Sequence, residues 1–127
     1  MYELARYMLS TFMTESNFIE PDIRREATVE EVDALERFIA VEQLTVPVLE
    51  ELASAFSPGA KLRDKFGMNV RVGNYRPPEG GLMIRTELDK LLKQANSAAP
   101  SKAWQLHVEY ERLHPFTDGN GRSGRAL

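Results

Sequence analysis

The sequence of 127 residues contains no cysteine, which excludes disulfides, a thiolate nucleophile and a cysteine-based zinc site. It has no run approaching the roughly 20 apolar residues that a membrane-spanning helix needs. The N-terminal segment carries Glu3 and Arg6 within its apolar run and has no small-residue cleavage site, so it is not typical of a signal peptide. We therefore expect a cytoplasmic protein with no membrane partner.

An excess of basic residues is also missing. Sixteen Lys and Arg stand against nineteen Asp and Glu, for a net charge of −3, whereas nucleic-acid-binding proteins are more often basic. No nucleic-acid partner is expected. With 43% apolar and 28% charged residues and no repeat, the chain has the composition of an ordinary globular protein. Its length suits a single domain over residues 1–127.

Apolar residues at helical spacing dominate the chain, which predicts an all-α fold. The capping box from Thr28 to Glu31 and the Thr45 cap with Pro47 behind it mark two helix starts. Ser101 is expected to cap the last clear helix, and Pro21 to stop the first. The expected helices cover residues 5–19, 28–39, 45–56, 84–95 and 101–113.

One glycine-rich stretch, residues 60–81, interrupts the helical pattern. Val70 and Val72 alternate with polar residues, which is a short strand signal. We expect a small β-hairpin flap near residues 62–75, followed by a loop at Pro77-Pro78. A plain surface loop is an equally good interpretation of the glycine-rich part, residues 73–81.

The segment HPFTDGNGRSGR, residues 114–125, concentrates the chemistry. Pro115 disfavours helical geometry at His114, so that histidine is expected at a helix C-terminus, where the dipole favours a cation. It is a candidate general base near neutral pH. Phe116 is expected to fix the loop in the core.

The second half of this segment is suited to a polyphosphate. Backbone N–H groups of Gly119, Asn120 and Gly121 can form an anion-binding nest. Arg122 and Arg125 are three residues apart and can bind phosphate oxygens through forked donors. Asp118 is the carboxylate that Mg²⁺ would take beside phosphates. Together these residues predict a site for a magnesium nucleotide with a base beside it.

The segment resembles the Fic family motif HxFx(D/E)GNGRxxR at every fixed position, a match expected by chance on the order of 10⁻¹⁰ per window. Ala103 and His107 resemble the approach to that motif, and LRDKFGMNVRVGNYRPP resembles the family's flap. The resemblance implies a mainly helical fold. It also implies transfer of AMP from ATP, with Mg²⁺, to a Ser, Thr or Tyr hydroxyl of a target protein.

The resemblance also implies a role for each motif residue. His114 would take the proton from the target hydroxyl, and Asp118 would hold Mg²⁺. The target backbone would pair with the flap as an added strand. The phosphates would be bound by Gly119, Asn120, Gly121, Arg122 and Arg125, and the target by Val70, Arg71 and Val72.

A second match lies near the N-terminus. Ser16 to Glu20 fits the family's inhibitory motif (S/T)xxxE(G/N), with Pro21 in place of Gly or Asn. In the family this Glu pairs with the second motif arginine, which here is Arg125. The expected organisation is an inhibitory helix over residues 1–21 and a Fic core over residues 22–127.

Other functions stay open at the level of sequence. The chain ends two residues after the motif, which leaves the last helix short. This favours a fragment, a fold completed by another chain or by a homo-oligomer, or a degenerate module that binds nucleotide without turnover. Glu20 could instead assist removal of AMP, and the donor could be another nucleotide.

Overall fold

The computed structural model describes residues 2–97 and 99–127, and within them the fold is all-α, as predicted. No named strand occurs in these residues, and a single 3₁₀ turn, η1, precedes α5. The elements are α1 (Tyr2–Ile19), α2 (Val29–Ile39), α3 (Val46–Phe56), α4 (Leu82–Ser97), η1 (Pro100–Lys102), α5 (Ala103–Leu113) and α6 (Asn120–Ala126).

The helix starts follow the capping signals in two cases out of three. Thr28 and Glu31 form the predicted capping box at α2. The Thr45 hydroxyl accepts from the N–H of Val48 at α3, with Pro47 in the first turn. The predicted Ser101 cap is wrong, because η1 leads directly into α5 and Lys102 occupies the N-cap without a side-chain bond.

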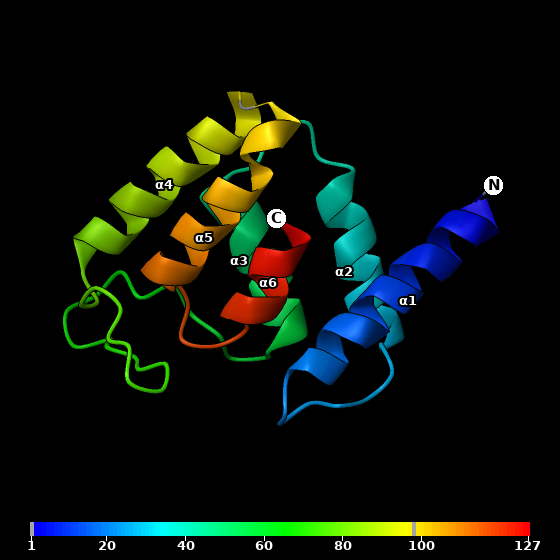
Figure 1. The fold of residues 1–127 in the computed structure, drawn as a ribbon, viewed down its shortest axis with the longest axis horizontal. Helices are drawn as coiled ribbons and strands as arrows, with labels where there is room; N and C mark the ends of the chain where they lie inside the picture. The colour runs from blue at the N-terminus through cyan, green and yellow to red at the C-terminus, as the bar shows by residue number, and fades with distance from the viewer. Residues whose placement is uncertain (1, 98) are drawn as a thin grey trace.

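The helices pack around α6, which lies in the centre of the molecule (Figure 1). Helix α6 contacts α1, α3 and α5, while α4 lies beside α5 and α1 lies beside α2. Short isolated helices are marginal in water, so the stability of α6 comes from this packing. The core between the helices contains Met13, Leu35, Leu49, Phe56, Ile84, Leu88, Tyr110 and Phe116.

The flap near residues 62–75 contains much less β structure than expected. A single antiparallel bridge joins Val72 to Tyr75, with Gly73 at φ 58° in the turn between them. Val70 and Arg71 are not part of a ladder. A second bridge, between Leu62 and Phe116, ties the start of the flap to the motif loop instead. The predicted hairpin is therefore a tight turn within a loop that has no regular secondary structure.

None of the helices over residues 2–97 and 99–127 is long and apolar enough to cross a membrane.

Candidate functional site

The motif loop begins where α5 ends, at His114. This residue is the C-cap, in the left-handed region at φ 50° and ψ 61°, and its N–H donates to the Tyr110 carbonyl at 2.9 Å. Pro115 follows and prevents the helix from continuing. Left-handed backbone is uncommon outside glycine, so the surrounding contacts must hold it.

The flap base runs antiparallel to this loop. The N–H of Arg63 donates to the Pro115 carbonyl at 2.8 Å, and the N–H of Thr117 donates to the Lys61 carbonyl at 2.9 Å. Phe116 is buried between these contacts, as predicted from its place in the motif. The motif loop is therefore held on one side by the core and on the other by the flap.

Asn120 closes the loop through its side chain. Its Nδ2 donates to the Phe116 carbonyl at 2.7 Å, and its Oδ1 accepts from the Phe116 N–H at 2.9 Å. Both side-chain groups are therefore used inside the loop. The sequence assigned the backbone N–H of Asn120 to phosphates, and the side-chain bonds of the loop do not use that N–H.

His114 lines a cleft of about 760 Å³, which collects the predicted site residues from three parts of the chain. The cleft lies between the end of α1, the flap and the motif loop. The predicted residues that line it are Glu20, Val70, Arg71, Val72, His114, Asp118, Gly119, Asn120, Gly121 and Arg122. Ser16 and Arg125 lie outside that lining.

Burial lowers the pKa of His114 below its ordinary value. A hydrogen bond to the backbone of Glu111 opposes this, and the nearby charge of Arg63 adds to the lowering. The dipole-based expectation of a favoured cation is thus outweighed by loss of solvent. A neutral imidazole at pH 7 is the form that can accept a proton.

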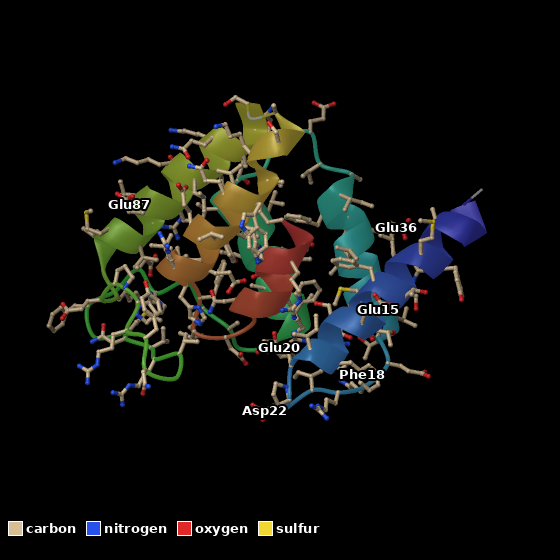
Figure 2. The ribbon with its side chains drawn as sticks, viewed as in Figure 1. Glu15, Phe18, Glu20, Asp22, Glu36 and Glu87 are labelled. Atoms are coloured by element: carbon tan, nitrogen blue, oxygen red, sulfur yellow. The ribbon has the colours of Figure 1, made fainter. Side chains whose placement is uncertain are left out.

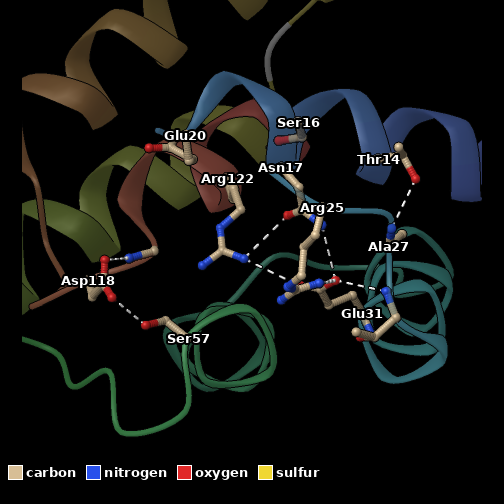
Figure 3. Close-up of polar contacts among 12 residues, drawn as sticks. Thr14, Ser16, Asn17, Glu20, Arg25, Ala27, Glu31, Ser57, Asp118 and Arg122 are labelled. Carbon is tan, nitrogen blue, oxygen red and sulfur yellow. Dashed lines mark hydrogen bonds and ion pairs between the residues drawn. The ribbon is translucent and has the colours of Figure 1, made fainter. Parts of the chain in front are cut away.

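Asp118 is oriented by its neighbours. The Ser57 hydroxyl donates to one carboxylate oxygen and the Gly119 N–H donates to the other at 2.8 Å (Figure 3). The bond from Ser57 is the largest influence lowering the pKa of Asp118, against the opposing effect of burial. Among the described residues no group of three acidic or histidine side chains gathers as a metal site. A single ionised carboxylate still fits Mg²⁺ that takes its other ligands from phosphates and water.

Arg122 is not free at the mouth of the cleft. It is 3% exposed and donates to Glu31 at 3.1 Å and to Asn17 at 3.4 Å (Figure 3). Its guanidinium also lies 5.6 Å from the centre of the Phe56 ring. These partners hold Arg122 where it lines the cleft, and its assignment to the outer phosphates stays a prediction.

Glu31, the partner of Arg122, accepts hydrogen bonds from several other residues. It accepts two bonds from Arg25, at 2.7 and 3.0 Å, and further bonds from the Asn17 side chain and the Thr28 N–H. The sequence indicates Glu31 only as a capping residue of α2. Nothing in the local pattern indicated its second role, because Asn17 and Arg122 come from distant helices.

Arg125 is held by the end of α1, where Glu20 lies beside α6 (Figure 2). Its Nη2 donates to Glu20 at 2.8 Å and to the Ser16 carbonyl at 3.0 Å, and its Nε donates to the Ser16 hydroxyl at 2.8 Å. Pro21 does not prevent this reach. The structure therefore brings together the three residues of the predicted inhibitory contact.

His107 has a structural contact, as expected for a residue on the inner part of α5. Its Nδ1 donates to the Gly124 carbonyl at 2.8 Å and so ties α5 to α6. Arg63 and Ser57 are the site neighbours that sequence reasoning missed. Arg63 lies in the segment that resembles the family's flap, but the sequence indicates no role for it, and Ser57 lies outside every motif.

A comparison with known protein families supports this description. Residues 28–127 match the sequence model of the Fic/DOC family. The match includes the flap and the whole motif loop and begins after α1.

Proposed function

Because the chain belongs to the Fic/DOC family, we propose that it is a protein adenylyltransferase, which transfers AMP from ATP to a Ser, Thr or Tyr hydroxyl of a target protein. The observation that carries this proposal is the cleft that joins His114 to the loop Asp118–Arg122 and to the flap. The proposed base, the proposed phosphate-binding backbone and the proposed docking segment all line this cleft. Transfer between two bound substrates depends on such an arrangement.

In the proposed reaction, neutral His114 takes the proton of the target hydroxyl. The hydroxyl oxygen forms a bond to the α-phosphorus, the bond from that phosphorus to the β-phosphate oxygen breaks, and pyrophosphate leaves with the electron pair. The lowered pKa of His114 supports the first step, because the imidazole is unprotonated at pH 7.

The phosphates are expected at the start of α6. The first N–H groups of a helix have no partner within it, and Gly119, at φ 75°, turns the chain into this helix. Gly121 carries no side chain to obstruct the approach. Asp118 is the residue that would hold Mg²⁺, which when bound supplies positive charge beside the phosphates.

We assign Glu20 the role of inhibitor. Arg125 is the second motif cation for the outer phosphates, and Glu20 with Ser16 accepts hydrogen bonds from its Nε and Nη2. While that contact lasts, Arg125 is unavailable to ATP. Release of Glu20 would free it, at the cost of a partly exposed ion pair.

The flap is assigned to the target. Residues 69–71 have no regular secondary structure and lie outside any ladder, and the exposed Arg71 and Val72 also line the cleft. An extended target segment can add to such a backbone as a strand. This would bring a hydroxyl toward His114.

The proposal is tested with ATP labelled at the α-phosphate, Mg²⁺ and a cell lysate. Glu20→Gly should increase protein labelling at least tenfold over wild type, and Glu20→Gly with His114→Ala should abolish it. Glu26→Gly, which removes an exposed carboxylate from the same loop, is the matched control and should label like wild type. Parallel reactions with the other labelled nucleoside triphosphates identify the donor.

A second candidate is a module that binds nucleotide without transferring it. The observation that favours it is that both motif arginines already have carboxylate partners, Glu31 and Glu20. Folded Glu20→Gly protein that binds ATP by calorimetry but labels nothing would favour this candidate over the transferase. If this chain instead removed label from a target protein that already carries labelled AMP, its activity would be removal of AMP.

A further inference from the structure

Arg63 is a cation in the interior of the protein. The residue is 0% exposed, yet no carboxylate lies within ion-pair distance of it among the described residues. Buried charges are normally paired, because leaving water is costly. The feature that holds Arg63 must therefore be strong and specific.

Four backbone carbonyls, which come from two segments of the chain, accept hydrogen bonds from the Arg63 guanidinium. At the end of α5, Nε donates to the His114 carbonyl at 2.7 Å and Nη2 donates to the Leu113 carbonyl at 2.9 Å. Nη1 donates to the Met68 carbonyl in the flap at 3.1 Å and to the Pro78 carbonyl in the loop that follows the flap at 2.9 Å. One planar guanidinium thus joins the two segments.

The α5 half of this contact has a clear physical basis. The last carbonyls of a helix have no partner within it and carry the negative end of the dipole. Arg63 satisfies them at the residue where the chain enters the left-handed region. A lysine could supply the charge there but not the planar fork of donors.

The backbone of Arg63 makes the same connection. Its N–H donates to the Pro115 carbonyl at 2.8 Å, and its carbonyl accepts from the Gly81 N–H at 2.9 Å. Side chain and backbone therefore both lie between the motif loop and the far end of the flap. Moving either segment alone would break bonds to this one residue.

We propose that Arg63 is a positioning residue which holds His114 and the flap in one fixed relation, so that the base and the docked target are aligned by a single side chain. The naming of His114 as base and of the flap as docking segment rests on the proposed function. The connection itself rests on the four hydrogen bonds.

The charge of Arg63 has a second consequence at His114. Burial is the main cause that lowers the pKa of this histidine, and the Arg63 guanidinium lowers it further. The Glu111 backbone, Asp118 and Glu20 act in the opposite direction. A substitution that removes the charge should raise the pKa of the imidazole, whereas one that keeps the charge should not.

Two amides report on the connection by hydrogen exchange. The His114 N–H is bonded to the Tyr110 carbonyl, and the Gly80 N–H is bonded to the Asn69 side chain in the flap. In Arg63→Lys we expect both to exchange at least tenfold faster than in wild type, while the Leu88 amide in the core does not change. Arg37→Lys, at an exposed ion pair on α2, should change none of them.

NMR titration provides the second reading, because the chain has only two histidines. In Arg63→Met the His114 imidazole should titrate at a higher pH than in wild type, because the lowering influence of the Arg63 charge is lost. In Arg63→Lys the titration of His114 should stay near wild type. If Arg63→Met does not fold, Arg63→Lys still tests the proposal through the two amides.

Unchanged exchange at His114 and Gly80 in folded Arg63→Lys would overturn the proposal, and so would acceleration at only one of them. These readings need no nucleotide, so they stand apart from a failure of the transferase assignment. If transfer is observed, Arg63→Lys on the Glu20→Gly background should reduce kcat at least tenfold with a smaller effect on the KM for ATP.

Discussion

The carboxylate of Glu20 lies directly over Gly121, and its Oε1 accepts a hydrogen bond from Arg125 at 2.8 Å. A Cβ at position 121 would collide with that carboxylate. The same glycine that leaves room for phosphates in the proposed reaction therefore leaves room for the inhibitory side chain. Glu20 and the phosphates are expected to compete for one place at the start of α6.

Glu20→Gln should cost little stability. The Glu20–Arg125 pair is partly exposed, and pairs of this kind contribute about 0.2–1 kcal/mol. Urea unfolding should therefore show a loss of about 1 kcal/mol or less. A loss of several kcal/mol would mean that the contact is part of the structural framework, and it would contradict a releasable inhibitor.

Glu31→Gln should be far more damaging than Glu30→Gln. Glu31 is buried and pairs with Arg122, and breaking a buried pair costs about 3–5 kcal/mol. Glu30, its exposed neighbour in the first turn of α2, is the matched control and should change the free energy of unfolding by about 0.5 kcal/mol or less. Equal effects in the two variants would contradict the central role of Glu31.

Acid should weaken the fold through the same residue. Burial raises the pKa of Glu31, but hydrogen bonds from Arg25, Thr28 and Asn17 outweigh it and leave the pKa below its ordinary value. A carboxylate with a lowered folded-state pKa adds stability above its unfolded pKa, and this is lost as pH falls through the folded value. The free energy of unfolding, measured from pH 7 downward, should therefore decrease below about pH 4.5. This decrease should be smaller in Glu31→Gln, which lacks the titrating carboxylate.

The pH profile of transfer should follow His114. Because its pKa lies below the ordinary 6.5, the imidazole stays neutral down to a lower pH than a free histidine. On the Glu20→Gly background, the acid limb of kcat/KM should be centred below pH 6.5, where His114 becomes protonated. An acid limb centred above pH 6.5 would contradict this.

Asn120→Ala should destabilise the motif loop. It removes both hydrogen bonds to Phe116 and leaves a buried N–H and C=O unsatisfied, at about 1–3 kcal/mol each. Asn74→Ala, at an exposed flap position, is the control and should be near neutral by urea unfolding. If Asn120→Ala were as stable as wild type, the side chain would be free for a ligand after all.

Much of the fold could be predicted from the sequence, because helix signals are local. The capping box at Thr28 needs only Glu31, three residues on, and Pro47 fits the first turn of α3 by its own geometry. The flap was predicted less well. Val70 and Val72 alternate as in a strand, but in the described part of the chain Val72 forms only the single bridge to Tyr75 and Val70 forms none. Alternation without a partner strand does not make a ladder.

By itself the sequence determined the motif and the all-α class, since these follow from short-range spacing and one contiguous segment. The meeting of the end of α1, the flap and the motif loop in one cleft depends on the tertiary structure. Only the tertiary structure decided what each arginine does. Arg122 pairs with Glu31 across 91 positions, and Arg63 binds the His114 carbonyl across 51. Periodicity specifies which face of a helix is buried, whereas a hydrogen bond between distant segments depends on how those helices pack.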